Sequence, residues 1–327
     1  MQDFKIEKQK IIRTLLFFVI LFVLLTGVSL LFERAMKNHD DWIQDRNKSI
    51  YRIQKEAANS IDVIVLGDSL SYSSMSPMEM WEEHGTAAFV CGSSGQKIQD
   101  TYYTLETVLE NQSPKLVILE TNTLFRGGKG LEALKDSLGA VANHYTALLR
   151  GHDIWKSAVT GKTYPTENYK GFLIRSDVKP YHKSKNAGKK KRNEEIPNVV
   201  LTYMEKIKKL CDDNGARLLL VGSPSPRNYT KKRHDSIEEY AKENSLPFLD
   251  LNLKVKELGI NWKTDSRDNG DHLNLSGAQK VTAYLGNYLA EEYELPDHRG
   301  EEAYASWNEE SAEYKQKADA FLSIIRR

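Results

Sequence analysis

Nineteen consecutive residues near the start of this chain, from Thr14 to Phe32, carry no charged side chain. As an α-helix this run is about 28 Å long, which matches the roughly 30 Å hydrocarbon core of a bilayer. A buried core helix is one alternative, but such helices usually keep a polar stripe over five turns. A cleaved signal peptide is another, yet its apolar region is usually shorter and ends in small residues, whereas Glu33 and Arg34 follow here. The run predicts one uncleaved transmembrane anchor over residues 14–32.

The charges that flank this run predict its orientation. Basic residues lie on both sides of it, namely Lys5, Lys8, Lys10 and Arg13 before it and Arg34 and Lys37 after it. Basic residues are enriched on the cytoplasmic side of a span. Four of them precede the run and two follow it closely, so residues 1–13 are predicted to be a cytoplasmic tail. The sequence has no second apolar run of spanning length. We therefore expect a single-pass protein of the cell membrane whose remaining chain is extracytoplasmic, joined to the anchor by a helical connector over residues 33–58.

Charge and cysteine content exclude three classes of protein. The 46 Lys and Arg residues nearly balance the 45 Asp and Glu residues, so the formal net charge is +1. Nucleic-acid-binding proteins normally carry a strong basic excess, so no nucleic-acid partner is expected. The two cysteines, Cys91 and Cys211, are too few for a disulfide framework or a four-cysteine zinc site.

Short apolar runs and helix-like stretches alternate along the rest of the chain and predict its fold. Five runs rich in aliphatic residues are predicted to be buried strands, at residues 61–66, 87–91, 116–120, 217–222 and 247–251. Stretches compatible with helices lie between them, at residues 96–110, 198–213 and 235–243. This alternation is typical of an α/β three-layer αβα sandwich with a mainly parallel five-stranded sheet. We assign that domain to residues 59–295.

Two segments do not follow this alternation of predicted strands and helices. Residues 123–195 are predicted to be an insertion, a lid or a surface loop, in which residues 131–149 are compatible with a helix. The insertion ends in a basic tract, residues 179–192, which is read either as a solvated loop or as a site of attraction to anionic lipid or polymer. Residues 296–327 are predicted to form a C-terminal amphipathic helix that packs on the domain through Ala303, Trp307, Tyr314, Ala318, Phe321 and Ile325.

A candidate nucleophile lies directly after the first predicted strand. The tetrapeptide Gly-Asp-Ser-Leu places Ser69 at the carboxyl edge of the sheet, where α/β folds bind ligands. Gly67 permits a tight exit from the strand. Taken alone, Ser69 is equally typical of a turn or of a helix N-cap, so the prediction depends on finding a base.

His272 is the candidate base. It lies in a loop dense in Asp, Asn and Gly, directly before an amphipathic stretch, and Asp268 and Asp271 are both close enough in sequence to orient its imidazole. The other histidines stand in polar or irregular surroundings and are expected at the surface, namely His39, His84, His144, His152, His182, His234 and His298.

Two further strand ends offer donors for the oxyanion of an acyl-transfer reaction. Gly92 follows the second strand, where its backbone N–H can point into the crevice, and Gly95 is an alternative. Asn122 follows the third strand and can present its side-chain amide. One such donor is worth about 2.7–4 kcal/mol of transition-state stabilisation. Suitable residue types at four sheet-edge loops are a stronger signal than any one of them.

The ordered set of Ser69 in Gly-Asp-Ser-Leu, Gly92, Asn122 and His272 resembles the SGNH (GDSL) hydrolase superfamily, over most of residues 60–293. The resemblance implies a parallel sheet sandwiched by helices. It also implies that Ser69 is the nucleophile and His272 the general base. The oxyanion hole would then be formed by the N–H groups of Ser69 and Gly92 and by the side chain of Asn122.

The sequence departs from the superfamily pattern in two places. The third block, usually G-x-N-D, keeps only Asn122, and the Asp expected three residues before the histidine is replaced by Asn269. The carboxylate is therefore either Asp268 or Asp271. Asp268 is preferred, because adjacent residues on a loop often point apart. The departures resemble membrane-anchored DltD-like proteins of cell-envelope modification, which can work with a membrane-bound O-acyltransferase on surface polymers.

These observations predict a serine esterase or acyltransferase that needs no metal or organic cofactor. The resemblance and the predicted location indicate acyl esters, O-acetyl esters first, on an envelope polysaccharide or another acylated glycan or lipid-linked substrate. The alternative is a catalytically idle anchored scaffold or binding subunit that partners a membrane-bound O-acyltransferase, since a fold alone does not establish a function.

Overall fold

The computed structural model describes residues 2–43, 45–164, 169–182 and 194–325. Its chain divides into two compact units. We call Met1–Gln44 with Leu138–Thr166 the helical unit, and Asp45–Ser137 with Glu167–Arg327 the sheet unit. Most of the predicted basic tract, residues 183–192, lies outside the described residues.

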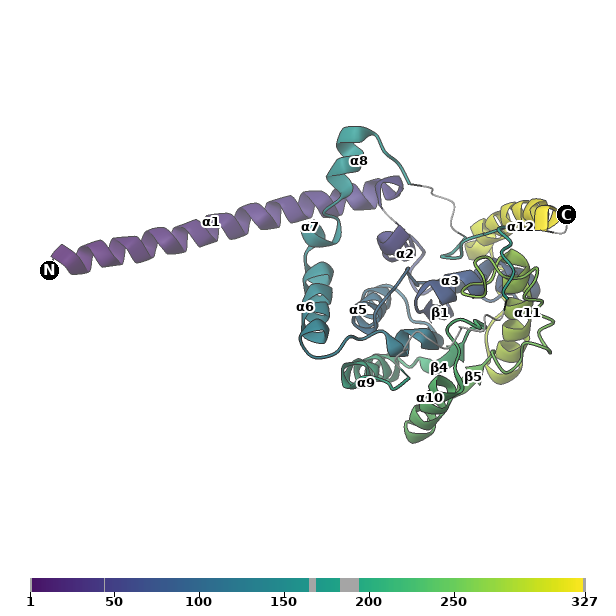
Figure 1. The fold of residues 1–327 in the computed structure, drawn as a ribbon. Coiled ribbons are helices and arrows are strands. Elements are labelled where there is room, and N and C mark those ends of the chain that lie inside the picture. The colour runs from purple at the N-terminus through teal and green to yellow at the C-terminus, as the bar shows by residue number, and fades with distance from the viewer. Residues whose placement is uncertain (1, 44, 165–168, 183–193, 326–327) are drawn as a thin grey trace. The chain divides into compact units, whose positions relative to one another are not determined.

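The helical unit is built on α1 (Gln2–Asn38), which is followed by the short 3-10 helix η1 (Asp40–Trp42). Within α1, the stretch Glu7–Asn38 is long and apolar enough to cross a membrane, a property that a signal sequence shares, and its apolar window is unburied. The prediction of a long apolar N-terminal helix is confirmed. Two helices from the predicted insertion, α7 (Ala147–Arg150) and α8 (Ile154–Thr160), pack against the C-terminal part of α1 (Figure 1). The helix α6 (Leu131–Tyr145) leads into them from the sheet unit.

The sheet unit contains five parallel strands in the order β2-β1-β3-β4-β5. Their bounds are β1 (Val63–Leu66), β2 (Ala88–Val90), β3 (Leu116–Glu120), β4 (Arg217–Gly222) and β5 (Phe248–Asp250). The predicted five-stranded parallel sheet is therefore confirmed. Strands β1, β2 and β5 are shorter than their apolar runs because the residues at the run ends turn into loops.

Helices cover both faces of the sheet because every strand is apolar on both of its sides. Ile64 and Leu66 of β1 belong to one apolar cluster, to which α5 (Ile98–Leu109) and α9 (Asn198–Asp213) contribute. Val63 and Val65 point the other way, into a cluster completed by α11 (Leu275–Glu292). Figure 1 shows these helices on opposite sides of the strands. The remaining described elements of the unit are α2 (Asp45–Ile53), α3 (Ser69–Ser74), α4 (Pro77–His84), η2 (Thr121–Phe125) and α10 (Lys231–Glu243).

The chain ends in η3 (Glu302–Tyr304) and α12 (Ala305–Ile325). Trp307, Tyr314 and Ala318 of α12 are buried against the first cluster, which Phe321 also contacts. Ala303 was expected on this buried face and is exposed, whereas its neighbour Tyr304 is buried. The reason is that the 3-10 turn of η3 shifts the helical phase ahead of α12. The side chain of Ile325 lies outside the described residues.

Candidate active site

The turn that follows β1 positions Ser69 at the carboxyl edge of the sheet. Gly67 has a φ of 152°, and a Cβ added there would lie 2.6 Å from the Cβ of Glu120, so a side chain does not fit. Asp68 then caps α3, accepting a hydrogen bond from the backbone N–H of Leu70 at 2.9 Å. Ser69 is consequently the first residue of α3, and the turn fixes its backbone.

Ser69, His272 and Asp268 form a continuous chain of hydrogen bonds. The Nε2 atom of His272 lies 2.7 Å from the Oγ atom of Ser69, and its Nδ1 atom lies 2.7 Å from Oδ2 of Asp268. The backbone N–H of His272 also donates to Oδ1 of Asp268, at 2.7 Å. The residues are 203 positions apart in sequence, so the fold alone brings the imidazole to the hydroxyl.

Two residues in left-handed conformation determine which aspartate meets the imidazole. Asn269 and Gly270 have φ values of 62° and 83°, so the loop doubles back between Asp268 and His272. Asp271 instead points towards Asn228, whose side-chain amide donates to its Oδ1 atom at 2.6 Å. The structure thus places Asp268 against the imidazole and directs Asp271 to another partner.

Asp268 is held in its charged form. Burial by itself raises its pKa, but the hydrogen bonds from the imidazole and the backbone N–H of His272 outweigh that effect, together with the charges of His272 and Arg267. The net result lowers the pKa of Asp268 from 3.8 to about 2. A carboxylate that stays ionised fixes the imidazole with a proton on Nδ1, which leaves Nε2 free to accept the proton of Ser69.

Three potential oxyanion donors lie on the turn that carries Ser69 or against it, namely the backbone N–H groups of Ser69 and Gly92 and the side-chain amide of Asn122, which is bonded to Asp68. Among the described residues, no group accepts a hydrogen bond from the backbone N–H of Ser69 or of Gly92. Gly92 lies tightly against the same turn, since a Cβ added there would come 2.0 Å from the Oγ atom of Ser71 and 3.1 Å from the carbonyl oxygen of Asp68. Gly95, the alternative, is exposed and has open space around it.

Asn122 follows β3, and both the nitrogen and the oxygen of its side-chain amide form hydrogen bonds. Its Nδ2 atom donates to Oδ2 of Asp68 at 2.7 Å, and its Oδ1 atom accepts from Nη1 of Arg233 at 3.0 Å. Arg233 also lies over the ring of Phe125, with its guanidinium carbon 4.2 Å from the ring centroid. This pairing fixes which end of the amide carries the donors, and one of the two Nδ2 hydrogens is engaged by Asp68.

Sequence reasoning missed two charged partners of this network besides Arg233. Arg126 forms an ion pair with the buried carboxylate of Asp68, with Nε and Oδ2 2.6 Å apart. Glu120, which stands in the altered third block, is fully buried and accepts a hydrogen bond from the backbone N–H of Asn122 at 3.0 Å. Burial, followed by the charge of Asp68, raises the pKa of Glu120 well above its usual value. Their only sequence signal is adjacency to Asn122.

A second histidine–carboxylate pair lies in the pocket next to Asn122 and Arg233. His234 was expected at the surface, but it is half-buried, with Nδ1 2.6 Å from Oδ2 of Asp250 at the end of β5. His298 is likewise half-buried, with Nε2 2.9 Å from Oδ2 of Asp62. The surface prediction fails for both because β5 and the start of β1 bring a carboxylate to each ring. It also fails for His84 and His144, which are half-buried.

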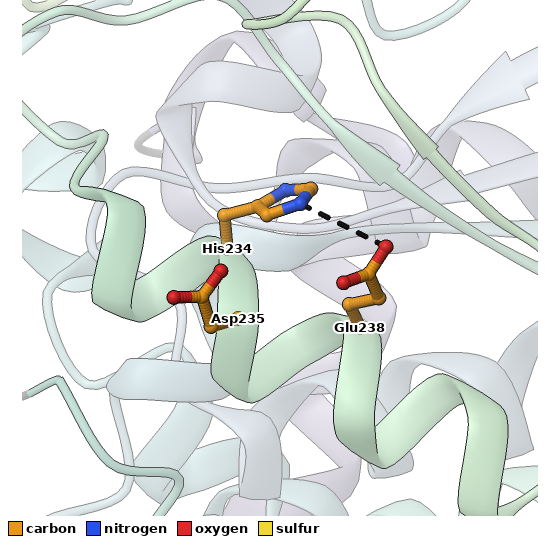
Figure 2. A group of neighbouring side chains, drawn as sticks. All are labelled: His234, Asp235 and Glu238. Carbon is orange, nitrogen blue, oxygen red and sulfur yellow. Dashed lines mark ion pairs between the residues drawn. The ribbon is translucent and has the colours of Figure 1, made fainter.

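His234 also belongs to a group of three potential metal ligands on α10, with Asp235 and Glu238 (Figure 2). Glu238 lies 3.9 Å from Nε2 of the imidazole, and both carboxylates are exposed. Asp235 is already paired with Lys231 at 2.8 Å. Ion pairs along a surface helix account for these positions.

Comparisons with known proteins give structural neighbours only. No protein-family model matches the chain, and no curated protein matches it. The structure described as that of a platelet activating factor from Streptococcus pneumonia is 13% identical, covers 81% of this chain and 98% of its own, and has a TM-score of 0.43. A GDSL-like lipase from Bacteroides thetaiotaomicron is 14% identical, with coverages of 76% and 98% and a TM-score of 0.40. A lipase/acylhydrolase from Enterococcus faecalis is 13% identical, with coverages of 72% and 99% and a TM-score of 0.37.

Proposed function

We propose that this protein is a membrane-anchored serine esterase or acyltransferase of the SGNH (GDSL) hydrolase superfamily. The observation that carries the proposal is the hydrogen-bond chain from the Ser69 hydroxyl through His272 to Asp268, with both links at 2.7 Å. A nucleophile, a base within hydrogen-bond reach and a third group that orients the base are the parts that covalent acyl transfer requires.

The proposed reaction begins with the Ser69 oxygen attacking an ester carbonyl while Nε2 of His272 takes the hydroxyl proton. Asp268 stabilises the resulting imidazolium. The N–H groups of Ser69 and Gly92 and the amide of Asn122 hold the negative charge of the tetrahedral intermediate. When this intermediate collapses, the carbon–oxygen bond to the alcohol breaks and His272 returns the proton to the leaving oxygen. The acyl group then remains on Ser69.

Release of the acyl group distinguishes an esterase from an acyltransferase. Water attacking the acyl-enzyme gives hydrolysis, and a sugar hydroxyl attacking it gives transfer, with His272 as the base in both. The resemblance to DltD-like proteins supports acyl esters of cell-envelope polysaccharide, O-acetyl esters first, and a membrane-bound O-acyltransferase as partner. We propose that α1 anchors the protein through residues 14–32, with residues 1–13 cytoplasmic and the sheet unit outside the membrane.

Turnover of a generic acetyl ester by the full-length protein in detergent tests this proposal. Ser69→Ala is expected to abolish hydrolysis of p-nitrophenyl acetate while the thermal unfolding temperature stays close to that of the unaltered protein. Ser323→Ala, on the exposed side of α12, is the matched control and is expected to retain full activity. Undiminished turnover by a folded Ser69→Ala variant would refute the role of Ser69, whereas an unaltered protein without any turnover would favour the idle scaffold.

A further inference from the structure

The contacts between α7 and α1 all lie near the C-terminal end of the apolar run of α1. The backbone N–H of Leu148 donates to Oγ of Ser29 at 3.3 Å, and Arg150 pairs with Glu33 at 2.5 Å. Gly151 lies against Met36, since a Cβ added at Gly151 would come 2.3 Å from the methionine sulfur. These contacts bring α7 against the last turns of α1.

The rise per residue of an α-helix gives the distance of these contacts from the end of the apolar run, and so their depth in a bilayer. Ser29 is three residues inside Phe32, the last residue of the uncharged run, and Met36 is four residues beyond it. At 1.5 Å per residue, the contacts extend from about 4.5 Å inside the end of the run to about 6 Å outside it. If residues 14–32 fill the hydrocarbon core, α7 lies where the hydrocarbon meets the lipid headgroups.

The segment that runs from α7 into α8 exposes large apolar side chains, and α8 also packs on η1 through a hydrogen bond from Oγ of Ser157 to the carbonyl oxygen of Trp42 at 3.4 Å. On α8, Ile154 and Ser157 are buried, whereas Trp155 is 53% and Val159 76% exposed, four residues apart on the same face. Leu149 of α7 is 49% exposed. Side chains of this kind that stay uncovered in water are unfavourable, because each buried Val or Leu is worth about 1.5–3 kcal/mol relative to an exposed one.

We infer that the α7–α8 segment, residues 147–160, is an interfacial membrane anchor whose exposed apolar side chains enter the lipid headgroup region. This inference rests on the proposed anchoring by α1. α7 contacts the unburied apolar run of α1 at Ser29, and that run places lipid next to the segment. Trp is enriched at membrane–water interfaces because its ring is amphipathic. Lys156 neighbours Trp155 and its ammonium pairs with Asp153, so the apolar side chains carry the inference.

The chain continues from both ends of this segment towards the sheet unit. The segment therefore gives the sheet unit an attachment to the bilayer that is separate in sequence from α1. A partner protein that covers the same side chains is the competing explanation, and the experiment separates the two.

Site-directed spin labelling of the full-length protein in lipid nanodiscs tests the inference. The native Cys91 and Cys211 are each 1% exposed, so one introduced cysteine can be labelled selectively. Three single variants are compared: Ile20→Cys in the middle of the apolar run, Val159→Cys on α8, and Lys232→Cys, whose native side chain is 77% exposed on α10. For each label, collision with lipid-soluble oxygen and with a water-soluble nickel chelate is measured.

The inference predicts that the label at residue 159 collides with oxygen and loses most of its nickel collisions, as at residue 20. The label at residue 232 should remain accessible to nickel. A nickel-accessible label at residue 159, with residue 20 in lipid, would overturn the inference and leave the anchor intact. Protection from both reagents would overturn it in favour of a second copy of the chain. A nickel-accessible label at residue 20 would overturn the anchor and the inference together.

Discussion

Replacing Asp268 by Asn tests how the proposed base is oriented. Asp268 contacts His272 twice, through Nδ1 and through the backbone N–H, each at 2.7 Å. Asp271→Asn is a matched control, because this carboxylate is next to His272 in sequence but accepts a hydrogen bond from Asn228. The two variants remove the same charge from the same loop, and they differ in whether the imidazole loses its partner.

The expected loss of activity is large. An Asn at position 268 presents an amide N–H to Nδ1, which favours the tautomer with its proton on Nε2 and so blocks proton transfer from Ser69. Such a replacement in a serine triad lowers kcat by about 10⁴. Each tenfold loss corresponds to about 1.4 kcal/mol of activation free energy, so the expected cost is about 4–5.5 kcal/mol.

The expected loss of stability is much smaller. The fall in the pKa of Asp268 from 3.8 to about 2 corresponds to about 2.4 kcal/mol before screening. The side chain is 33% exposed, and solvent screening reduces this contribution to about 1 kcal/mol. Because a depressed carboxylate pKa stabilises the fold above the unfolded pKa, this contribution is present near neutral pH and is lost as the pH falls towards about 2.

Activity and unfolding are therefore measured together on the full-length protein. Initial rates on p-nitrophenyl acetate are expected to fall by about 10³–10⁴ in Asp268→Asn and by less than about fivefold in Asp271→Asn. Thermal unfolding should shift by only a few degrees in either variant. The reasoning is wrong if Asp268→Asn keeps a tenth of the activity, or if Asp271→Asn is the more damaging change.

Three further predictions concern the network around Asn122. Asn122→Ala should lower kcat about 10²–10³-fold with little change in KM, because a donor that acts on the oxyanion is lost. Arg233→Met keeps an apolar contact with Phe125 but removes the donor to the Asn122 carbonyl oxygen, so kcat should fall about tenfold and be partly restored in Arg233→Lys. Unchanged kcat in Arg233→Met would exclude a positioning role. Glu120→Gln tests the role of a buried carboxylic acid, because burial raises the pKa of Glu120. The folded protein keeps a proton that the unfolded chain releases, so stability should decline as pH rises above about 4.5, and unfolding temperatures of the variant should decline less steeply.

Much of the fold could be predicted from the sequence because parallel strands buried on both faces leave continuous apolar runs. The strand bounds differ only by the residues that turn away from the sheet, such as Ile61 and Cys91. The four candidate residues could also be placed at one sheet edge, since each follows a strand end or precedes a helix. Periodicity carries no information on the loop conformation that selects Asp268, which depends on the positive φ values of Asn269 and Gly270.

Contacts between distant elements could not be predicted for a different reason. Arg233 lies on α10 and Asn122 after β3, and no local pattern relates them. The same holds for His234 with Asp250, and for Glu33 with Arg150 in the helical unit. Each pair depends on how two elements pack, so the charged residues at these positions read as ordinary surface residues in the sequence.

Covalent labelling with a serine-reactive fluorophosphonate shows whether His272 activates the hydroxyl of Ser69. The probe traps a hydroxyl that a neighbouring base has activated, and peptide mass spectrometry identifies the modified residue whatever the natural acyl group is. We expect one adduct, on the peptide that contains Ser69, and its disappearance in a folded His272→Ala variant. An unlabelled native protein, or labelling of Ser69 that persists without the imidazole, would contradict this expectation.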